Sequence, residues 1–225
     1  MIIIDMLRTS LIDYPGQVST VLYNGKCDFR CVYCDNIKNL NKEPLLSYFQ
    51  IRKILLDRKH LVDHVVLSGC EFILEPDIIP FLIFLKNEGF SVKLDTNGNS
   101  PDKLKKIIDK NLLDYVAMDI KAPLEKIRGV TRKHKGLIHY NIVDSIDILK
   151  TSNIEHEFRT TVYKDLFNEY HFKQMLDLIS DYRLEQKYYI QNISGDRFEK
   201  EDLENLLGII DLGKQYNIKV GFRNF

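Results

Sequence analysis

Short apolar runs alternate with helical segments along most of this chain, and this alternation constrains the fold more than any other feature of the sequence. Residues 62–67 contain three valines and a leucine, which is typical of a buried strand. In residues 168–182 the apolar side chains recur three and four positions apart, which is the spacing of an amphipathic helix. Strands and helices in this order predict right-handed crossovers and a parallel sheet covered by helices.

The expected elements define an open α/β barrel. We expect strands at 18–23, 62–67, 90–94, 115–120, 157–163, 187–191 and 218–222, and helices at 46–58, 76–87, 101–110, 138–151, 168–182 and 200–213. Ser47 and Ser100 are positioned to cap two of these helices. About six βα units are too few for a closed TIM barrel, so the pattern favours a partial (β/α)6 TIM-like barrel with parallel strands. A doubly wound sheet is the competing arrangement.

Composition narrows the class of protein. The chain has 225 residues, of which 44% are hydrophobic, and Lys plus Arg equals Asp plus Glu at 32 each. These values predict one globular domain over residues 1–225 with no global preference for nucleic acid or an anionic membrane. The sequence lacks a signal-peptide pattern and a membrane-spanning apolar run, and its four cysteines do not suggest a secreted disulfide framework. We therefore expect a cytoplasmic protein, and we interpret residues 124–136 as an exposed loop.

Three cysteines form a metal-binding pattern directly after the first predicted barrel strand. Cys27, Cys31 and Cys34 have the spacing C-x3-C-x2-C. Thiolates that close on one centre favour zinc or an iron–sulfur cluster. Both usually require four ligands, so three local cysteines leave one metal position open. A zinc site completed by Cys70 or a histidine is the alternative, although no second C-x2-C or H-x3-H follows at zinc-finger spacing.

Polar residues follow several of the other predicted strands. They occupy positions 68–71, 95–98, 119–121 and 159–161. Because chemistry in parallel α/β folds is located at the carboxyl ends of the strands, these positions and the cysteine loop are expected to form one site.

The chain resembles the radical S-adenosylmethionine (radical SAM) enzymes. The cysteine spacing and the partial barrel carry this resemblance. Four further segments resemble one branch, the activating proteins of anaerobic ribonucleoside-triphosphate reductase, which are similar to pyruvate formate-lyase activating enzyme. They are TSLIDYPG at 9–16, KLDTNG at 93–98, DYVAMDIKAP at 114–123 and FRTTV at 158–162.

The resemblance implies an oxidoreductase that works anaerobically. Cys27, Cys31 and Cys34 would hold a [4Fe-4S] cluster whose fourth iron is chelated by the amino and carboxylate groups of S-adenosylmethionine. Reductive cleavage would give a 5′-deoxyadenosyl radical, which abstracts a hydrogen atom. The branch implies that the hydrogen comes from a glycine of a large reductase, the partner protein, and that a flavodoxin- or ferredoxin-type protein supplies the electron.

The resemblance also implies roles for residues around the cluster. Tyr33 would lie near the adenine, and Asp35 stands where relatives usually have histidine. Lys121 and Arg159 resemble cationic residues that line the cofactor region, and a surface salt bridge is the alternative for Lys121.

Three further residues resemble the ligands of a monovalent cation. Asp95, Thr96 and Asp119 match positions that bind such an ion beside the methionyl carboxylate in related activating enzymes. Capping and loop hydrogen bonds are the alternative for these side chains.

Residues 68–72 depart from the family pattern. Relatives carry Gly-Gly-Glu-Pro where this chain keeps Gly69 and Glu71 but has Cys70 and Phe72. In the relatives, the backbone of this segment receives the amino group of the cofactor. The Cβ of Cys70 is an obstacle to close approach and to positive φ, whereas backbone hydrogen bonds survive if the local φ is negative. Cys70 is either a fourth cluster ligand or, as we favour, a small residue packed beside the cofactor.

Other readings remain open. The chemistry could act on a small molecule, as in deazaguanine synthesis, or on another peptide. Alternatively, the chain is an iron–sulfur binding module with a decayed cofactor site. Residues 190–225 receive no assigned role, although we expect substrate contacts among 191–197, the termini and 124–136.

Overall fold

The computed structural model describes residues 1, 3–162, 168–181, 185–192 and 207–223. For residues 200–206 it describes the backbone but not the side chains. Eight strands form one sheet in the order β1 to β8. Strands β2 to β8 are parallel, and β1 pairs antiparallel with β2. The strands are β1 (Ile3–Tyr14), β2 (Gln17–Asn24), β3 (His64–Gly69), β4 (Ser91–Thr96), β5 (Tyr115–Asp119), β6 (Glu155–Val162), β7 (Gln186–Asn192) and β8 (Ile218–Arg223). The predicted partial barrel with parallel strands is confirmed.

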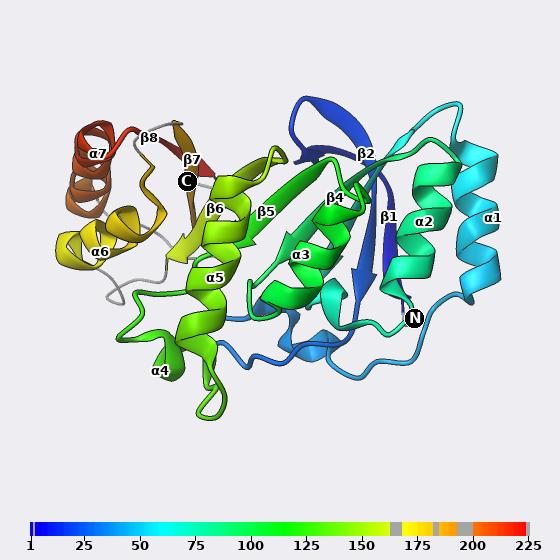
Figure 1. Ribbon diagram of the computed structural model, residues 1–225, viewed down its shortest axis with the longest axis horizontal. Helices are drawn as coiled ribbons and strands as arrows, with labels where there is room; N and C mark the ends of the chain where they lie inside the picture. Colours follow the sequence, from blue (N-terminus) through cyan, green and yellow to red (C-terminus); the bar gives the residue numbers. More distant parts are fainter. Residues whose placement is uncertain (2, 163–167, 182–184, 193–199, 224–225) are drawn as a thin grey trace.

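The helices cover one face of the sheet. Figure 1 shows α1, α2, α3 and α5 side by side across that face, with α6 and α7 beside β7 and β8. The helices are α1 (Tyr48–Arg58), α2 (Ile78–Asn87), α3 (Pro101–Asp109), α4 (Ile127–Thr131), α5 (Ile138–Thr151), α6 (Glu169–Ile179) and α7 (Lys200–Gln215), with short 3₁₀ helices η1 (Asp35–Asn39) and η2 (Phe72–Leu74). No helix in these described ranges is long and apolar enough to cross a membrane.

Strand β1 was not expected from the sequence. It forms a hairpin with β2 and turns through Gly16, whose φ is +69°. Leu7, Leu11 and Ile12 are exposed, so the strand lacks the alternation of buried and exposed apolar residues that marks a half-buried strand. Its position at the edge of the sheet explains this pattern, because little of the strand is covered by other elements.

The interpretation of 124–136 as an exposed loop is wrong for part of that segment. Residues Ile127–Thr131 form helix α4, and Ile127, Val130 and Thr131 are buried. A single short turn of helix has too few residues to show helical periodicity in the sequence. The remainder, at 132–136, is mostly exposed.

The two predicted helix caps differ in outcome. Ser47 accepts a hydrogen bond from the Gln50 N–H and forms a capping box at the start of α1, as expected. Ser100 occupies the cap position of α3 but makes no side-chain cap bond. Pro101 starts that helix, and its fixed φ favours the first helical turn without the cap.

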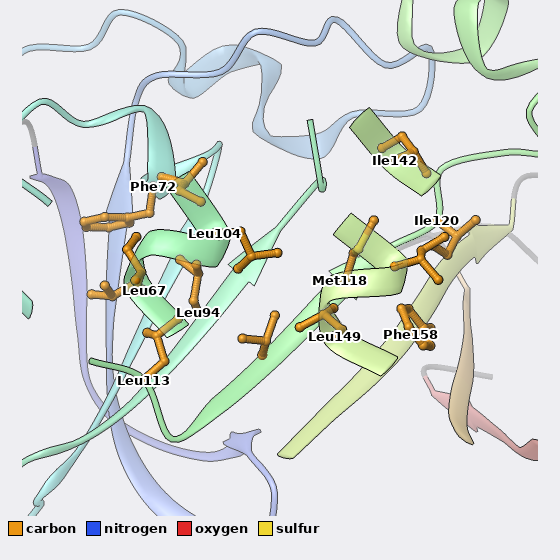
Figure 2. Packing of buried hydrophobic residues seen from close by; sticks show 14 of the residues in the cluster. Leu67, Phe72, Leu94, Leu104, Leu113, Met118, Ile120, Ile142, Leu149 and Phe158 are labelled. Atoms are coloured by element: carbon orange, nitrogen blue, oxygen red, sulfur yellow. The ribbon is translucent and has the colours of Figure 1, made fainter. Parts of the chain in front are cut away.

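The main core lies between the sheet and the helices. Figure 2 shows Leu67, Leu94, Met118 and Phe158 of successive strands packed beneath helical residues such as Leu149. The opposite face of the sheet has a smaller core of Tyr14, Val21, Val66, Tyr115 and Ala117. Successive side chains of each strand therefore pack into different cores on the two faces of the sheet. Asp95, Asp119 and Arg159 lie on the face of the smaller core.

Leu94→Ala should destabilise the protein by about 3 kcal/mol, because Leu94 is fully buried and its removal leaves a cavity in the main core. Leu61→Ala is the matched control, since Leu61 is 63% exposed, and it should change the stability by less than about 0.5 kcal/mol. Urea unfolding followed by circular dichroism measures both. Equal effects of the two substitutions would contradict the packing described here.

Candidate active site

A cavity of about 260 Å³ opens at the carboxyl edge of the parallel strands. All four cysteines line it. So do Tyr33, Asp35, Gly69, Asp95, Thr96, Asp119, Lys121 and Arg159. Of the residues that the sequence placed in the site, only Glu71 is absent from its lining. The convergence expected for strand-end residues is therefore observed.

Backbone hydrogen bonds from helix α4 hold the cysteine loop in place. The Arg30 N–H donates to the Thr131 carbonyl at 2.9 Å, and the Val32 N–H donates to the Val130 carbonyl at 3.0 Å. Part of the segment predicted to be an exposed loop thus supplies acceptors that shape the cysteine motif.

Asp28 provides a second anchor for the same loop. Its carboxylate accepts hydrogen bonds from the side-chain amides of Asn97 and Asn99, beyond the end of β4, and pairs with Lys133 at 3.3 Å. Asp28 was not predicted from the sequence, although a carboxylate between two cysteines of the motif was a usable signal. These contacts connect the loop to two other segments at the same edge of the sheet.

Burial favours the neutral form of two of the motif thiols, those of Cys27 and Cys31. Burial raises the pKa of Cys27 to about 12, and it also raises the pKa of Cys31. Because a bound metal deprotonates a coordinating thiol, a metal centre would stabilise the thiolate form that burial in the protein disfavours. Soft thiol donors in one cavity fit an iron–sulfur cluster. Within the described part of the chain, no three His, Cys, Asp or Glu side chains are arranged to hold a single metal ion.

The end of strand β3 is shaped by a glycine and by Asn24. Gly69 has a φ of +99°, and a Cβ there would lie 3.0 Å from the backbone N and O of Asn24. The Cys70 N–H donates to the Asn24 side-chain oxygen at 3.1 Å. Cys70 itself does not have a positive φ, so the expected backbone conflict at this position is not observed. Asn24 was also missed, although a polar residue at the end of an apolar strand indicated it.

Glu71 lies behind the cavity instead of facing it. Its side chain is 1% exposed and accepts hydrogen bonds from the Asn97 N–H at 2.6 Å and the Thr96 hydroxyl at 2.9 Å. Burial raises the pKa of Glu71 to about 8, despite the opposing effect of these bonds. The carboxyl group connects the ends of β3 and β4, and its geometry is that of a positioning residue.

Arg159 joins two carboxylates at the centre of the site. Its Nε donates to Asp119 at 3.0 Å, and its Nη1 lies 3.4 Å from Asp95. Lys121 contacts Asp119 at 3.1 Å, and Lys93 lies 3.4 Å from Asp95. Three cations therefore surround two carboxylates, which leaves one positive charge uncompensated.

Burial and pairing act in opposite directions on these groups. Burial alone would raise the pKa of Asp95 and of Asp119, but the Arg159 guanidinium and a nearby lysine outweigh it, so both pKa values fall below the usual range. Burial likewise would lower the pKa of Lys121 and of Arg159, but the carboxylates raise both. All four groups are consequently charged at neutral pH.

Tyr33, Asp35 and Gln191 also line the cavity. The Tyr33 side chain is buried and its hydroxyl donates to the Lys121 carbonyl at 3.0 Å, whereas Asp35 is exposed at the start of η1. Gln191 at the end of β7 lines the cavity, in the segment where substrate contacts are expected. Residues 193–197 of that segment lie outside the described residues.

The sequence matches the model of the radical SAM superfamily over residues 21–179. The chain belongs to this superfamily. Membership implies the use of a [4Fe-4S] cluster and S-adenosylmethionine, and it sets aside the zinc interpretation of the cysteines.

Two curated relatives are similar in sequence. One from Methanocaldococcus jannaschii, named "Putative glycyl-radical enzyme activating enzyme", is 30% identical over 211 residues, which span 91% of this chain and 87% of the relative. The pyruvate formate-lyase-activating enzyme of Clostridium pasteurianum is 32% identical over 120 residues, which span 49% of this chain and 48% of that enzyme.

Two solved structures share the fold. SuiB from Streptococcus suis bound to S-adenosylmethionine aligns with a TM-score of 0.64 and 14% identity over 91% of this chain and 50% of that one. QueE from Escherichia coli aligns with a TM-score of 0.58 and 16% identity over 99% of this chain and 93% of that one. At these identities the likeness concerns the fold alone.

Replacing Arg159 by methionine should destabilise the apoprotein by about 3 kcal/mol near neutral pH, because two largely buried carboxylates lose their shared cation. The pairing lowers both carboxyl pKa values, so its contribution is present above the ordinary pKa of about 4 and is lost as the pH falls through the lowered values. The difference between wild type and R159M should therefore shrink at low pH.

Urea unfolding at several pH values measures this difference. Lys105→Met is the control, since Lys105 forms an exposed pair with Asp109 and its loss should change stability by less than about 0.5 kcal/mol at any of these pH values. An effect of R159M that is independent of pH would contradict a charge-pairing role.

Proposed function

We propose that this radical SAM enzyme is a glycyl-radical activating enzyme whose target is an anaerobic ribonucleoside-triphosphate reductase. The observation that carries the proposal is the match to the Methanocaldococcus jannaschii relative, which extends over 91% of this chain and 87% of the relative. The four segments that resemble the reductase-activating branch support the choice of target. A flavodoxin- or ferredoxin-type protein is the proposed electron donor.

In this proposal Cys27, Cys31 and Cys34 hold the [4Fe-4S] cluster. When bound, the cluster supplies the electron that cleaves S-adenosylmethionine into methionine and a 5′-deoxyadenosyl radical. The contacts of the cysteine loop with α4 and Asp28 support this assignment, because a rigid loop keeps three thiolates directed to one centre.

The charged groups at the strand ends would bind the methionyl part of the cofactor. Lys121 and Arg159 lie beside the thiols at the cavity wall, and the uncompensated positive charge suits a carboxylate. The amino group would be received by the backbone around Gly69 and Cys70. Because Arg159 is already held by Asp95 and Asp119, it needs little reorganisation to bind an anion.

A monovalent cation at Asp95, Thr96 and Asp119 stays a prediction, and the charge balance weighs against it. Both carboxylates are already paired with protein cations. The Thr96 hydroxyl donates to Glu71. A bound cation would have to displace these partners.

Tyr33 and Asp35 would contact the adenosyl part. The buried ring of Tyr33 offers a surface against which adenine can pack, and its hydrogen bond to the Lys121 carbonyl fixes the ring. Asp35 is exposed at the rim of the cavity, where a carboxylate can accept hydrogen bonds from adenine or ribose.

The anaerobically reconstituted protein, given dithionite and S-adenosylmethionine, should release 5′-deoxyadenosine and methionine in equal amounts. Cys31→Ala should lose both the cluster absorbance and at least about 100-fold in cleavage rate, because one cluster ligand is removed. Chromatography of the products measures the rate, and the Lys105→Met control should keep it. Full cleavage by Cys31→Ala would refute the cluster assignment.

With an anaerobic ribonucleoside-triphosphate reductase added, electron paramagnetic resonance should show a glycyl-radical doublet that depends on S-adenosylmethionine. A reductase whose radical-bearing glycine is replaced by alanine is the matched control and should give no doublet. Cleavage without any doublet would contradict this target and direct attention to a small molecule or another peptide. Failure of intact cluster to bind or cleave S-adenosylmethionine would point to a decayed cofactor site.

A further inference from the structure

The fourth cysteine lines the same cavity as the three cysteines of the motif. Cys70 follows Gly69 at the end of β3, far from the motif in sequence, and is half-buried. Its N–H is held by Asn24, through the side-chain oxygen at 3.1 Å and the carbonyl at 3.3 Å. The backbone of this lining residue is therefore fixed in position.

The Cys70 thiol is only weakly held by hydrogen bonding to other protein groups. Its one side-chain hydrogen bond within the described residues is a weak one, from Sγ to the Asn36 carbonyl at 3.9 Å. Apart from the cysteines, the cavity is lined by amides, hydroxyls, carboxylates, cations and apolar side chains, which are harder ligands than a thiolate or are not ligands at all. Cys70 is thus the one soft donor in the cavity, beyond the motif, among the described residues.

We propose that Cys70 is an exchangeable fourth ligand of the cluster, which binds the iron not held by Cys27, Cys31 or Cys34 until S-adenosylmethionine replaces it. The inference rests on the proposed function, since it assumes a cluster on the three motif cysteines. A role as a cluster ligand explains why residue 70 is a cysteine, since the backbone geometry at this position does not require one.

The exchange involves no net oxidation or reduction. The bond between the iron and the Cys70 sulfur breaks, and the thiolate keeps its electron pair and takes up a proton. The amino nitrogen and a carboxylate oxygen of S-adenosylmethionine then donate electron pairs to the same iron, and the ammonium group loses a proton on binding. Charge and atoms balance without a further reactant.

The test exploits the lability of an iron that has no protein ligand. Stepwise ferricyanide oxidation of the reconstituted cluster, without S-adenosylmethionine, converts a cluster with an open iron into a three-iron cluster plus Fe²⁺. Wild type should resist this loss, and Cys70→Ala should form about fivefold more three-iron cluster under the same conditions. Electron paramagnetic resonance and released iron measure the conversion independently of any activity.

Cys70→Ser separates the thiolate from the size of the side chain. If the thiolate is the ligand, serine should be as labile as alanine, because a hydroxyl is a poor ligand for this iron. A cluster as stable in Cys70→Ala as in wild type would overturn the proposal. So would a stable cluster in Cys70→Ser beside a labile one in Cys70→Ala, since size alone would then explain the effect.

The affinity for S-adenosylmethionine is a second measurement, and the direction of its expected change is definite. Removing a competing internal ligand should tighten the apparent affinity for S-adenosylmethionine, by about tenfold in Cys70→Ala. Weaker binding in this variant would show that Cys70 is a packed residue beside the cofactor and would contradict the proposal. If no variant and no wild type assembles a cluster, the proposed function fails instead.

Discussion

The charge pairing of Arg159 with Asp95 and Asp119 is the interaction on which the active-site edge depends. Asp95 and Asp119 lie at the carboxyl ends of β4 and β5, Arg159 lies within the adjacent β6, and none of the three would tolerate burial without a partner. The pairing therefore stabilises the edge and keeps the groups ionised. Lys93 and Lys121 add further positive charge to this network, which supports the proposal that it binds the carboxylate of the cofactor.

Around this network, separate segments converge on one short cysteine loop. Helix α4 provides carbonyl acceptors, and Asp28 connects the loop to the residues that follow β4. Glu71 and Asn24 join the ends of β2, β3 and β4 from behind the cavity. The cavity is thus assembled from contacts between distant parts of the chain, which is why its shape is more specific than the loop sequence alone indicates.

Most of the fold was predictable, and the failures have local physical causes. Apolar runs such as 62–67 and the amphipathic spacing of 168–182 gave the strands and helices with small boundary errors. Strand β1 was missed because an edge strand buries few side chains, and α4 was missed because it is a single short turn. The strand-end residues were found because a parallel sheet gathers them at one edge. Glu71, however, was expected in the cavity and lies behind it, since the sequence does not specify the direction of a side chain in a turn.

The sequence by itself determined the order of strands and helices, the three-cysteine motif and the superfamily, because these depend on local spacing and on residue type. Only the tertiary structure decided which charges neutralise one another, that Gly69 and not Cys70 carries the positive φ, and that all four thiols share one cavity. These properties depend on distances between residues far apart in the chain. No local pattern encodes such distances, which arise when the strands pack side by side.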